Sequence, residues 1–256
     1  MTPSTGLPTA LKAPLPDALA WLESDVQALV RPTAFIKRPP TSKGVALSIA
    51  PMGSTRAWGS PDIPIDAPWA PTERLAYLHD QWRSSPYDGE SFWLQLNLAE
   101  IPADVAMHLP EGCPRMGVVW VFINLRGDWT GTARFDPRDA STIAWQPRTS
   151  TNSPQEPGPA QWAADTTVPC STPKTLPAIA SNWDSMAEHY DDWVQDQYRG
   201  QSDVQIGGWL WPIQGDFDDR QETFVCALER QSFGDSGAVY LHFSAAEGFF
   251  VHVETC

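Results

Sequence analysis

Hydrophobic and polar side chains alternate most regularly over Phe92–Leu98, FWLQLNL, and this pattern predicts a β-strand near the centre of the fold. Three leucines fall on one face, which we expect to pack into the core. The opposite face carries Trp93, Gln95 and Asn97. Polar groups in such positions either line a site or satisfy backbone groups, and the pattern alone leaves both roles open.

Other apolar runs predict further strands, and segments rich in Gly and Pro separate them. The run after Leu109 begins with a turn, and a hairpin over Gly234–Gly237 joins two of the later strands. The expected strands lie within Val45–Ala50, Leu109–Asn124, Ala133–Phe135, Ile143–Trp145, Phe224–Glu229, Ala238–Ser244 and Phe249–Glu254.

Apolar positions at helical spacing predict three amphipathic helices. The first begins at Asp17, a suitable capping residue, and ends before Pro32, because the residue before a proline is pushed out of the helical region. The helices cover about residues 17–30, 72–84 and 183–198. The stripe of the third helix that we expect to be buried comprises Trp183, Met186, Tyr190, Trp193, Val194 and Gln197.

Residues 146–180 have a different composition, with many prolines among serines and threonines. Proline cannot donate a hydrogen bond to a neighbouring strand, so we expect no strand in this segment. It is predicted to be a connector within a single domain that covers residues 1–256.

The same order of features occurs twice in the chain. Each part has a Gly/Pro loop, then a strand, then a glycine followed by an aromatic-rich strand. The three features are Gly59–Pro64, Phe92–Leu98 and Gly117–Ile123 in the first part, and Gly207–Pro212, Phe224–Glu229 and Gly237–Phe243 in the second. A degenerate duplication of one β-rich unit is the interpretation that we favour, because the spacing does not match a short repeat array.

These segments resemble the YwqG-like family, a bacterial group of domains of unknown function. The resemblance spans about residues 45–254 and rests on five motifs in a fixed order. The matching positions include Gly59, Pro61, Ile63, Pro64 and Trp69, then Leu94–Pro102, then Leu109, Pro110, Gly112 and Gly117–Phe122, then Gly207, Gly208 and Gln214, and finally Gly234, Asp235, Gly237, Tyr240 and Phe243. Trp58, Leu210 and Ala227–Arg230 depart from the family pattern, and residues 72–84 form an insertion.

The resemblance implies an α+β fold with antiparallel sheets from two pseudo-repeated halves and a few peripheral helices. The family has no established reaction, and the resemblance therefore implies no catalytic residue and no cofactor. Its members often accompany bacterial toxin loci, where small acidic proteins act as immunity partners. That association carries the weight of an analogy.

The formal net charge is −14 over 256 residues, which argues against nucleic acid or an anionic membrane as a direct partner. It permits a basic protein partner that long-range attraction would steer in. The four cysteines form no CxxC pair, so neither a zinc site nor a disulfide framework is indicated. The first residues lack a basic segment followed by an apolar run, and we expect a cytoplasmic protein.

Acidic residues gather on the outer face of the predicted third helix and in the turn that follows it. We hypothesise that they bind a basic toxin or effector domain, which would make the protein an immunity protein, or antitoxin, that acts by stoichiometric binding. The alternative is a solvated helix face. The candidate residues are Asp184, Glu188, Asp191, Asp192, Asp196, Asp216, Asp218 and Asp219.

A second hypothesis is an enzyme or a small-ligand-binding protein with a pocket between the two halves. The residues expected to line that pocket are Gln95, Asn97, Trp209, Trp211 and Gln214. His242 and His252 lie on adjacent predicted strands and would bind a metal only with a third ligand, which is not evident. We therefore expect packed histidines and no metal site.

Overall fold

The computed structural model describes most of the chain in several stretches. These are residues 10–37, 50–57, 61–68, 90–124, 130–147, 160–171, 175–176, 183–198, 204–211, 218–228 and 237–255. The predicted strand at 45–50 and the predicted helix at 72–84 lie, apart from Ala50, outside the described residues.

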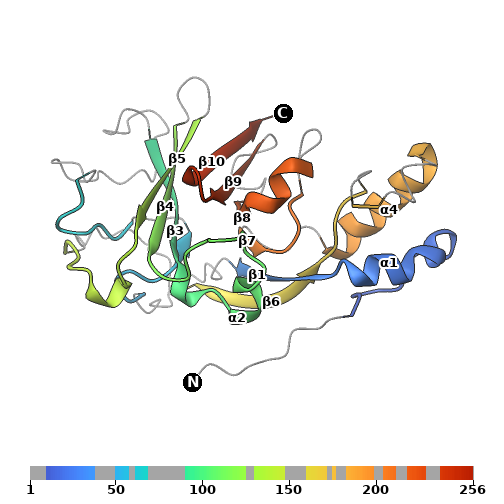
Figure 1. Cartoon of the computed structure of the whole chain (residues 1–256), viewed down its shortest axis with the longest axis horizontal. Helices are drawn as coiled ribbons and strands as arrows, with labels where there is room; N and C mark the ends of the chain where they lie inside the picture. The colour runs from blue at the N-terminus through green and yellow to red at the C-terminus, as the bar shows by residue number, and fades with distance from the viewer. Residues whose placement is uncertain are drawn as a thin grey trace, which may run out of the picture.

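Two antiparallel sheets face each other in the described part of the protein (Figure 1). The larger sheet has six strands in the order β10 (Gly248–Thr255), β9 (Gly237–Ser244), β8 (Phe224–Leu228), β7 (Val204–Gly207), β1 (Arg31–Lys37) and β6 (Gln161–Thr167). The smaller sheet has four strands in the order β2 (Arg56–Ala57), β3 (Glu90–Asn97), β4 (Val118–Asn124) and β5 (Thr130–Asp136). The expected α+β architecture with antiparallel sheets is confirmed.

The main core lies between the two sheets, because each sheet turns one apolar face toward the other. Leu94 and Leu96 of β3 and Val239 and Leu241 of β9 are among its buried residues. At one side of the sandwich β5 lies against β10, and the rings of Phe135 and Phe249 are 5.0 Å apart between centroids. The burial of Leu94, Leu96 and Leu98 that the sequence predicts is confirmed.

A β-bulge near the start of β3 alters which side chains face the core. Phe92 pairs with Phe122, and Leu94 pairs with Val121, the residue just before Phe122, so Trp93 is the extra residue. Trp93 therefore belongs to the main core with Leu94, whereas Gln95 faces the outer side of the sheet. The sequence-based expectation that Trp93 shares a face with Gln95 is wrong for this reason.

Helical segments from the start of the described chain and from the segment between β6 and β7 form a lobe beside the larger sheet, and we call it the helical lobe (Figure 1). It comprises η1 (Asp17–Leu22), α1 (Glu23–Ala28) and α4 (Trp183–Tyr198). Leu19, Leu22 and Val26 pack there with Tyr190 and Val194. The other helices within the described residues are short, namely η2 (Leu98–Glu100), α2 (Ala103–Ala106), η3 (Ala140–Thr142) and η4 (Asp218–Thr223).

Four strands lie where the sequence predicts none, namely β1, β2, β6 and β7. β6 occupies residues 161–167 inside the proline-rich segment, because its prolines stop at Pro159 and resume at Pro169. β1 contains Pro32, yet its pairing with β7 begins only at Thr33, so the missing amide hydrogen is not needed there. The average composition of 146–180 therefore gave a wrong prediction for this short stretch.

Candidate functional site

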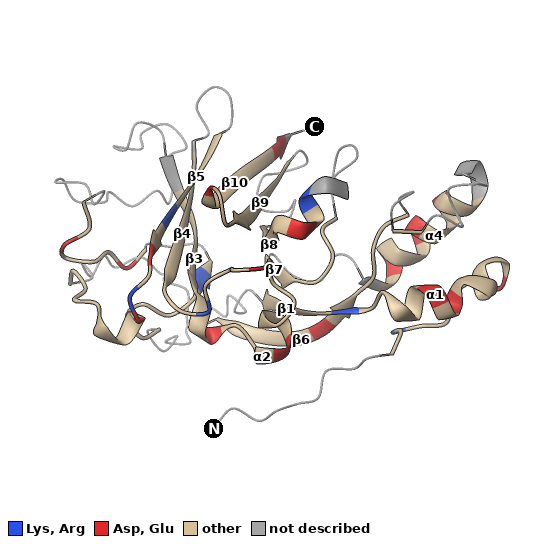
Figure 2. Ribbon diagram, viewed as in Figure 1, with Lys and Arg blue, Asp and Glu red and all other residues tan. Residues whose placement is uncertain are grey.

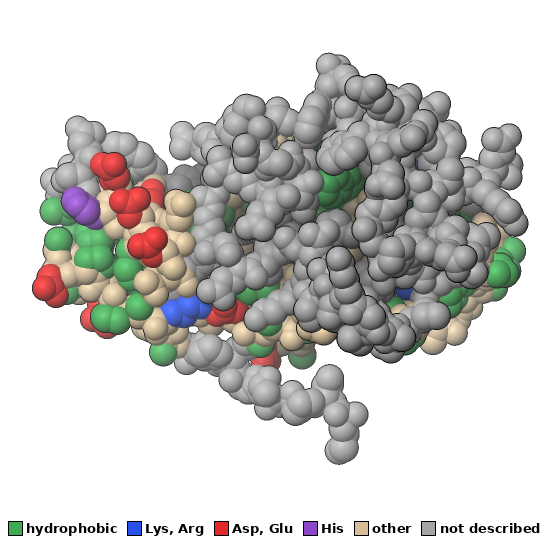
Figure 3. Space-filling view, turned by 180° about the vertical axis from the view of Figure 1, so that it is seen from behind, with side chains coloured by type: hydrophobic (Ala, Val, Ile, Leu, Met, Phe, Trp, Pro, Cys, Tyr) green, Lys and Arg blue, Asp and Glu red, His purple; other side chains and the backbone are tan. Residues whose placement is uncertain are grey.

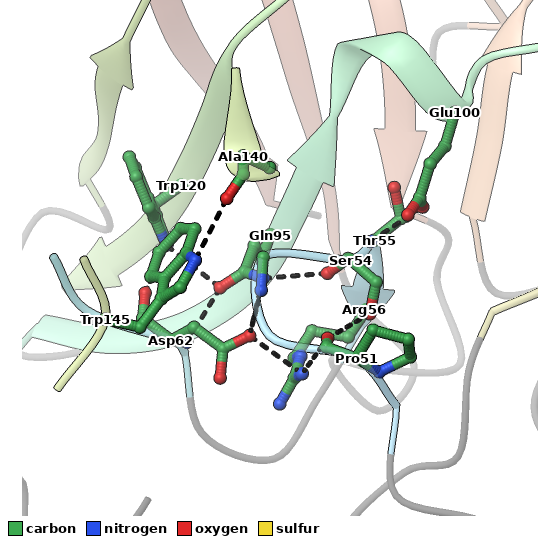
Figure 4. Close-up of polar contacts among 11 residues, drawn as sticks. Pro51, Ser54, Thr55, Arg56, Asp62, Gln95, Glu100, Trp120, Ala140 and Trp145 are labelled. Atoms are coloured by element: carbon green, nitrogen blue, oxygen red, sulfur yellow. Dashed lines mark hydrogen bonds and ion pairs between the residues drawn. The ribbon is translucent and has the colours of Figure 1, made fainter. Parts of the chain in front are cut away.

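Gln95 lies at the centre of a buried polar network on the outer face of the smaller sheet (Figure 4). Its Oε1 accepts hydrogen bonds from the backbone N–H of Asp62 at 2.7 Å and from Trp120 Nε1 at 3.1 Å. Its Nε2 donates to the Ser54 carbonyl at 2.7 Å and to Asp62 Oδ2 at 3.2 Å. An amide side chain has two acceptor positions and two donors, so the protein itself uses all of them.

A buried ion pair completes this network. Arg56 Nη2 donates to Asp62 Oδ2 at 2.9 Å, and the two side chains are 5% and 0% exposed. The backbone N–H of Gly53 donates to the same oxygen at 2.7 Å. Gly53 has φ of +75°, and an added Cβ would collide with the Trp145 ring. The network therefore holds the loops around residues 50–57 and 61–68 against the sheet.

The other residues expected to line a pocket have separate partners. Asn97 Oδ1 accepts from the backbone N–H of Ala99 at 3.1 Å, which caps η2. Trp209 Nε1 donates to the Leu29 carbonyl at 2.6 Å beside the helical lobe. Trp211 Nε1 donates to the Val168 carbonyl at 3.2 Å. Gln214 lies outside the described residues. Gln95 thus belongs to the small sheet's network, and the two tryptophans anchor the loop after β7.

The acidic candidates on α4 divide into two groups. Glu188, Asp192 and Asp196 are exposed. Asp191 instead accepts hydrogen bonds from the backbone N–H and the hydroxyl of Ser171, at 2.8 and 2.6 Å. Burial raises the pKa of Asp191, and the hydrogen bonds from Ser171 act in the opposite direction. Asp191 is therefore a structural link to the segment after β6, and the expectation that it lies on the open acidic face is wrong.

For four further acidic candidates the side chain lies outside the described part of the structure. Asp184 lies in the first turn of α4, and Asp218 and Asp219 begin η4, but their side chains are outside the described part. Asp216 also lies outside it.

The helical lobe carries more exposed acids than the sequence analysis singled out (Figures 2 and 3). Asp17, Glu23 and Asp25 of η1 and α1 are exposed, and the Trp21 side chain beside them is 53% exposed. These acids occupy positions off the apolar face of the predicted helix at 17–30, so the sequence pattern could have identified them. Basic residues next to the lobe have other contacts, since Lys12 pairs with Asp165 at 2.7 Å and Arg31 lies over the Trp209 ring.

A third polar group lies on the outer face of β9 and β10. His242 is opposite Phe250 and His252 is opposite Tyr240, so the two histidines share a face without facing each other. Tyr240 donates from its hydroxyl toward the Trp211 carbonyl at 3.0 Å, with Glu254 Oε2 at 3.2 Å. In the stretches that the structure describes, no group of three or more His, Cys, Asp or Glu residues could hold a metal ion.

These features define a two-sheet α+β protein with a satisfied buried network and an acidic helical lobe. The sequence profile of the family described as "Domain of unknown function (DUF1963)" matches residues 55–246, and the chain belongs to that family. A search of curated proteins found no match. Of the helices in the described stretches, none combines the length and the apolar character that crossing a membrane requires.

Proposed function

We propose that the protein is a binding module whose helical lobe docks on a basic surface of a partner protein. The observation that carries this proposal is the set of exposed carboxylates on the helical segments of one lobe, together with an exposed tryptophan that lies between Asp17 and Glu23 in the chain. Those residues are Asp17, Glu23, Asp25, Glu188, Asp192, Asp196 and Trp21. A large aromatic side chain within a charged rim is the composition that binding hot spots favour.

The spacing of acids along α4 supports a charged partner. Glu188, Asp192 and Asp196 are four residues apart, so they form a line with about 6 Å between neighbours at 1.5 Å rise per residue. Like charges four apart destabilise a helix by about 0.2–0.5 kcal/mol per pair. A basic partner would relieve this repulsion and would also be attracted at long range, because the whole chain is acidic.

The partner class that we propose is a basic toxin or effector domain, which would make the protein a bacterial immunity protein in the cytoplasm. This finer assignment rests on the resemblance to YwqG-like proteins and on the acidity of the chain. It requires no reaction and no cofactor, since neutralisation would follow from stoichiometric binding alone. A site that uses Gln95 is less favoured, because that side chain has no hydrogen-bonding position left for a ligand.

The test compares two double variants with the same change in charge. Glu188→Lys with Asp192→Lys reverses charge on the lobe, whereas Glu111→Lys with Glu247→Lys does so at exposed positions elsewhere. The tagged wild-type protein is used to capture a partner from the native cytoplasm, and Kd is then measured with purified components at low and high salt. We expect the lobe variant to weaken binding at least about tenfold, equivalent to 1.4 kcal/mol, and the control variant to have a small effect.

Equal weakening by both variants would show that net charge alone drives the association, and would contradict docking on the lobe. No weakening by either variant would place the interface elsewhere. A 1:1 mass in solution is the expected stoichiometry for neutralisation. Trp21→Ala then tests the aromatic contact, because a buried anchor contributes to the dissociation rate at any salt concentration.

A further inference from the structure

Arg31, the first residue of β1, is a partly exposed cation that pairs with no carboxylate in the stretches that the structure describes. Its guanidinium carbon lies 3.6 Å from the centre of the Trp209 ring instead. The chain has 31 acidic residues and only 17 basic ones, so an arginine without an acidic partner stands out. Asp165, the acid closest to Arg31 in the strand register, is bound by Lys12 at 2.7 Å. The N–H donors of Arg31 therefore remain for another group.

The turn after β7 fixes the Trp209 ring on which the guanidinium lies. Trp209 Nε1 donates to the Leu29 carbonyl at 2.6 Å, and the backbone N–H of Trp209 donates to Thr167 Oγ1 at 2.9 Å. Thr167 is the residue of β6 opposite Arg31. Gly208 has φ of +77°, and an added Cβ would collide with Thr167 Oγ1, so the turn requires a glycine there. The ring and the guanidinium are thus positioned before any ligand arrives.

A ligand can approach this stack from solvent. The start of β1 lies where the helical lobe meets the larger sheet (Figure 1). Ile36 of β1 belongs to the main core, so Arg31, five positions earlier, lies on the opposite face of the strand. Arg31 is partly exposed, and so are the apolar side chains of Leu29, Val30 and Trp211 at the rim of the lobe's core. The charged group therefore has accessible apolar surface around it.

The chemistry of the stack selects a carboxylate. A guanidinium with a ring over one face presents its edge, where two parallel N–H bonds match the two oxygens of a carboxylate. A phosphate dianion would bring twice the negative charge to a chain whose net charge is already −14. Burial lowers the pKa of Arg31, because its charge is partly removed from water, and a bound carboxylate would offset that cost.

We propose that Arg31, stacked on Trp209, binds the carboxylate of a small organic acid or of a peptide C-terminus, whose apolar part packs on Leu29, Val30 and Trp211. This site uses a cation, whereas docking of a basic partner uses the carboxylates of the helical lobe. Either proposal can therefore fail without the other.

The experiment follows the Arg31 Nε–H resonance of the full chain, labelled with 15N at its arginines, during titration with N-acetyl-L-leucine. N-acetyl-L-leucinamide has the same apolar part without the negative charge and is the matched control ligand. Arg115 is exposed and serves as a control within the same spectrum. We expect the acid to shift the Arg31 resonance saturably with a Kd of about 1 mM or tighter, while the amide leaves it unchanged and the Arg115 resonance stays constant.

Two further ligands separate the sources of the negative charge. The tetrapeptide Ala-Ala-Ala-Leu with a free C-terminus should bind more tightly than N-acetyl-L-leucine if the natural ligand is a peptide C-terminus, and more weakly if it is a small acid. Inorganic phosphate should bind more weakly than either. Tighter binding of phosphate than of both carboxylates would contradict the assignment of a carboxylate.

A pair of variants then tests the role of Arg31. Arg31→Lys keeps the positive charge and removes the planar group, and Arg115→Lys makes the same change at the control position. With the Trp209 indole N–H resonance as the readout in all three proteins, we expect Kd for the acid to rise at least about tenfold in Arg31→Lys and to stay unchanged in Arg115→Lys.

Three results would overturn the proposal. They are no saturable shift of the Arg31 resonance, an equal shift with the amide, and an unchanged affinity in a folded Arg31→Lys variant. If that variant does not fold, the comparison of acid and amide on the wild-type protein alone decides.

Discussion

The antiparallel strand pairs β3–β4 and β8–β9, which we call the first and the second hairpin, share the same pairing pattern. They differ in the polar side chains on their outer faces. Each first strand has one extra residue, after Phe92 in β3 and after Phe224 in β8. The two hairpins can therefore be aligned pair by pair. The pairs Phe92–Phe122 and Gln95–Trp120 of the first hairpin correspond to Phe224–His242 and Ala227–Tyr240 of the second.

The aligned pairs show where polar groups have been placed. In the first hairpin a glutamine stands beside the bulky Trp120, and loop residues satisfy every polar atom of that glutamine. In the second hairpin the corresponding position is Ala227, and the polar residue moves to the place that Phe122 occupies in the first. Within the stretches that the structure describes, His242 Nε2 has no hydrogen-bond partner. Every polar atom of the glutamine on the first face is thus satisfied, whereas the second face buries the ring of His242 with one nitrogen that has no partner among the described residues.

The largest loss of stability that we predict comes from removing the Asp62 carboxylate from the buried network of the first hairpin. Asp62→Ala leaves the buried guanidinium of Arg56 without its carboxylate and removes acceptors from Gly53 and Gln95. Removing one partner of a buried ion pair destabilises a protein by about 3–5 kcal/mol. We therefore expect a loss of that size in the free energy of unfolding, measured by urea denaturation.

The matched control for Asp62 is the exposed Asp66 in the same loop. Asp66 pairs with Arg138 at 2.7 Å, and hydrogen bonds from Arg138 lower the pKa of Asp66. Exposed ion pairs contribute little to stability because water and salt screen them, so Asp66→Ala should change the free energy of unfolding little. A similar loss in both variants would show that the loop, rather than the buried network, limits stability.

The second prediction concerns acid and uses the second hairpin. Burial and the nearby Arg220 lower the pKa of His242 from 6.5 to about 4 in the folded protein, so the unfolded chain binds a proton more readily in that range. Stability should therefore fall as the pH drops from about 6.5 toward 4, and this contribution should level off below that range. One pKa unit corresponds to 1.36 kcal/mol, which sets an upper limit of about 3 kcal/mol.

Subtracting the pH profile of His242→Phe from that of wild type isolates this histidine from the many carboxylates. The variant places in the second hairpin the residue that the first hairpin has at Phe122. We expect the difference in unfolding free energy to grow in favour of the variant as the pH falls from 6.5 to 4. A difference that does not depend on pH would mean that His242 is protonated equally in both states.

The same two hairpins show what the sequence could and could not predict. Alternation predicts β3, β9 and the burial of the leucines, because packing against one core imposes period two. The bulge at Trp93 escapes such a pattern, since a single extra residue changes the face without changing the composition. The partner of Gln95 also escapes it, because Asp62 lies 33 positions earlier in a loop of irregular structure.

The helical lobe gives a parallel lesson. Helical periodicity predicts that Tyr190, Trp193 and Val194 are buried, and they are. The same periodicity places Asp191 among the solvated acids. Its contact with Ser171 depends on where the segment after β6 passes, which is a tertiary feature with no local signal.

The smallest effect that we predict concerns Gln221, which holds the loop after β7. Gln221 Oε1 accepts from the backbone N–H of Leu210 at 2.6 Å, and its Nε2 donates to the Gly208 carbonyl at 3.2 Å. This loop has additional anchors, because Gln205 Nε2 donates to two carbonyls and Thr167 accepts from the Trp209 amide. Gln221 is also only partly buried, so water can replace some of its bonds.

We therefore expect Gln221→Ala to lower the unfolding free energy by about 1 kcal/mol. Gln95→Ala should lower it by about 2 kcal/mol or more, since its partners are buried. Urea denaturation of the two variants side by side measures the contrast, and a larger loss for Gln221→Ala would mean that the loop after β7, not the loop at Asp62, is the more tightly held.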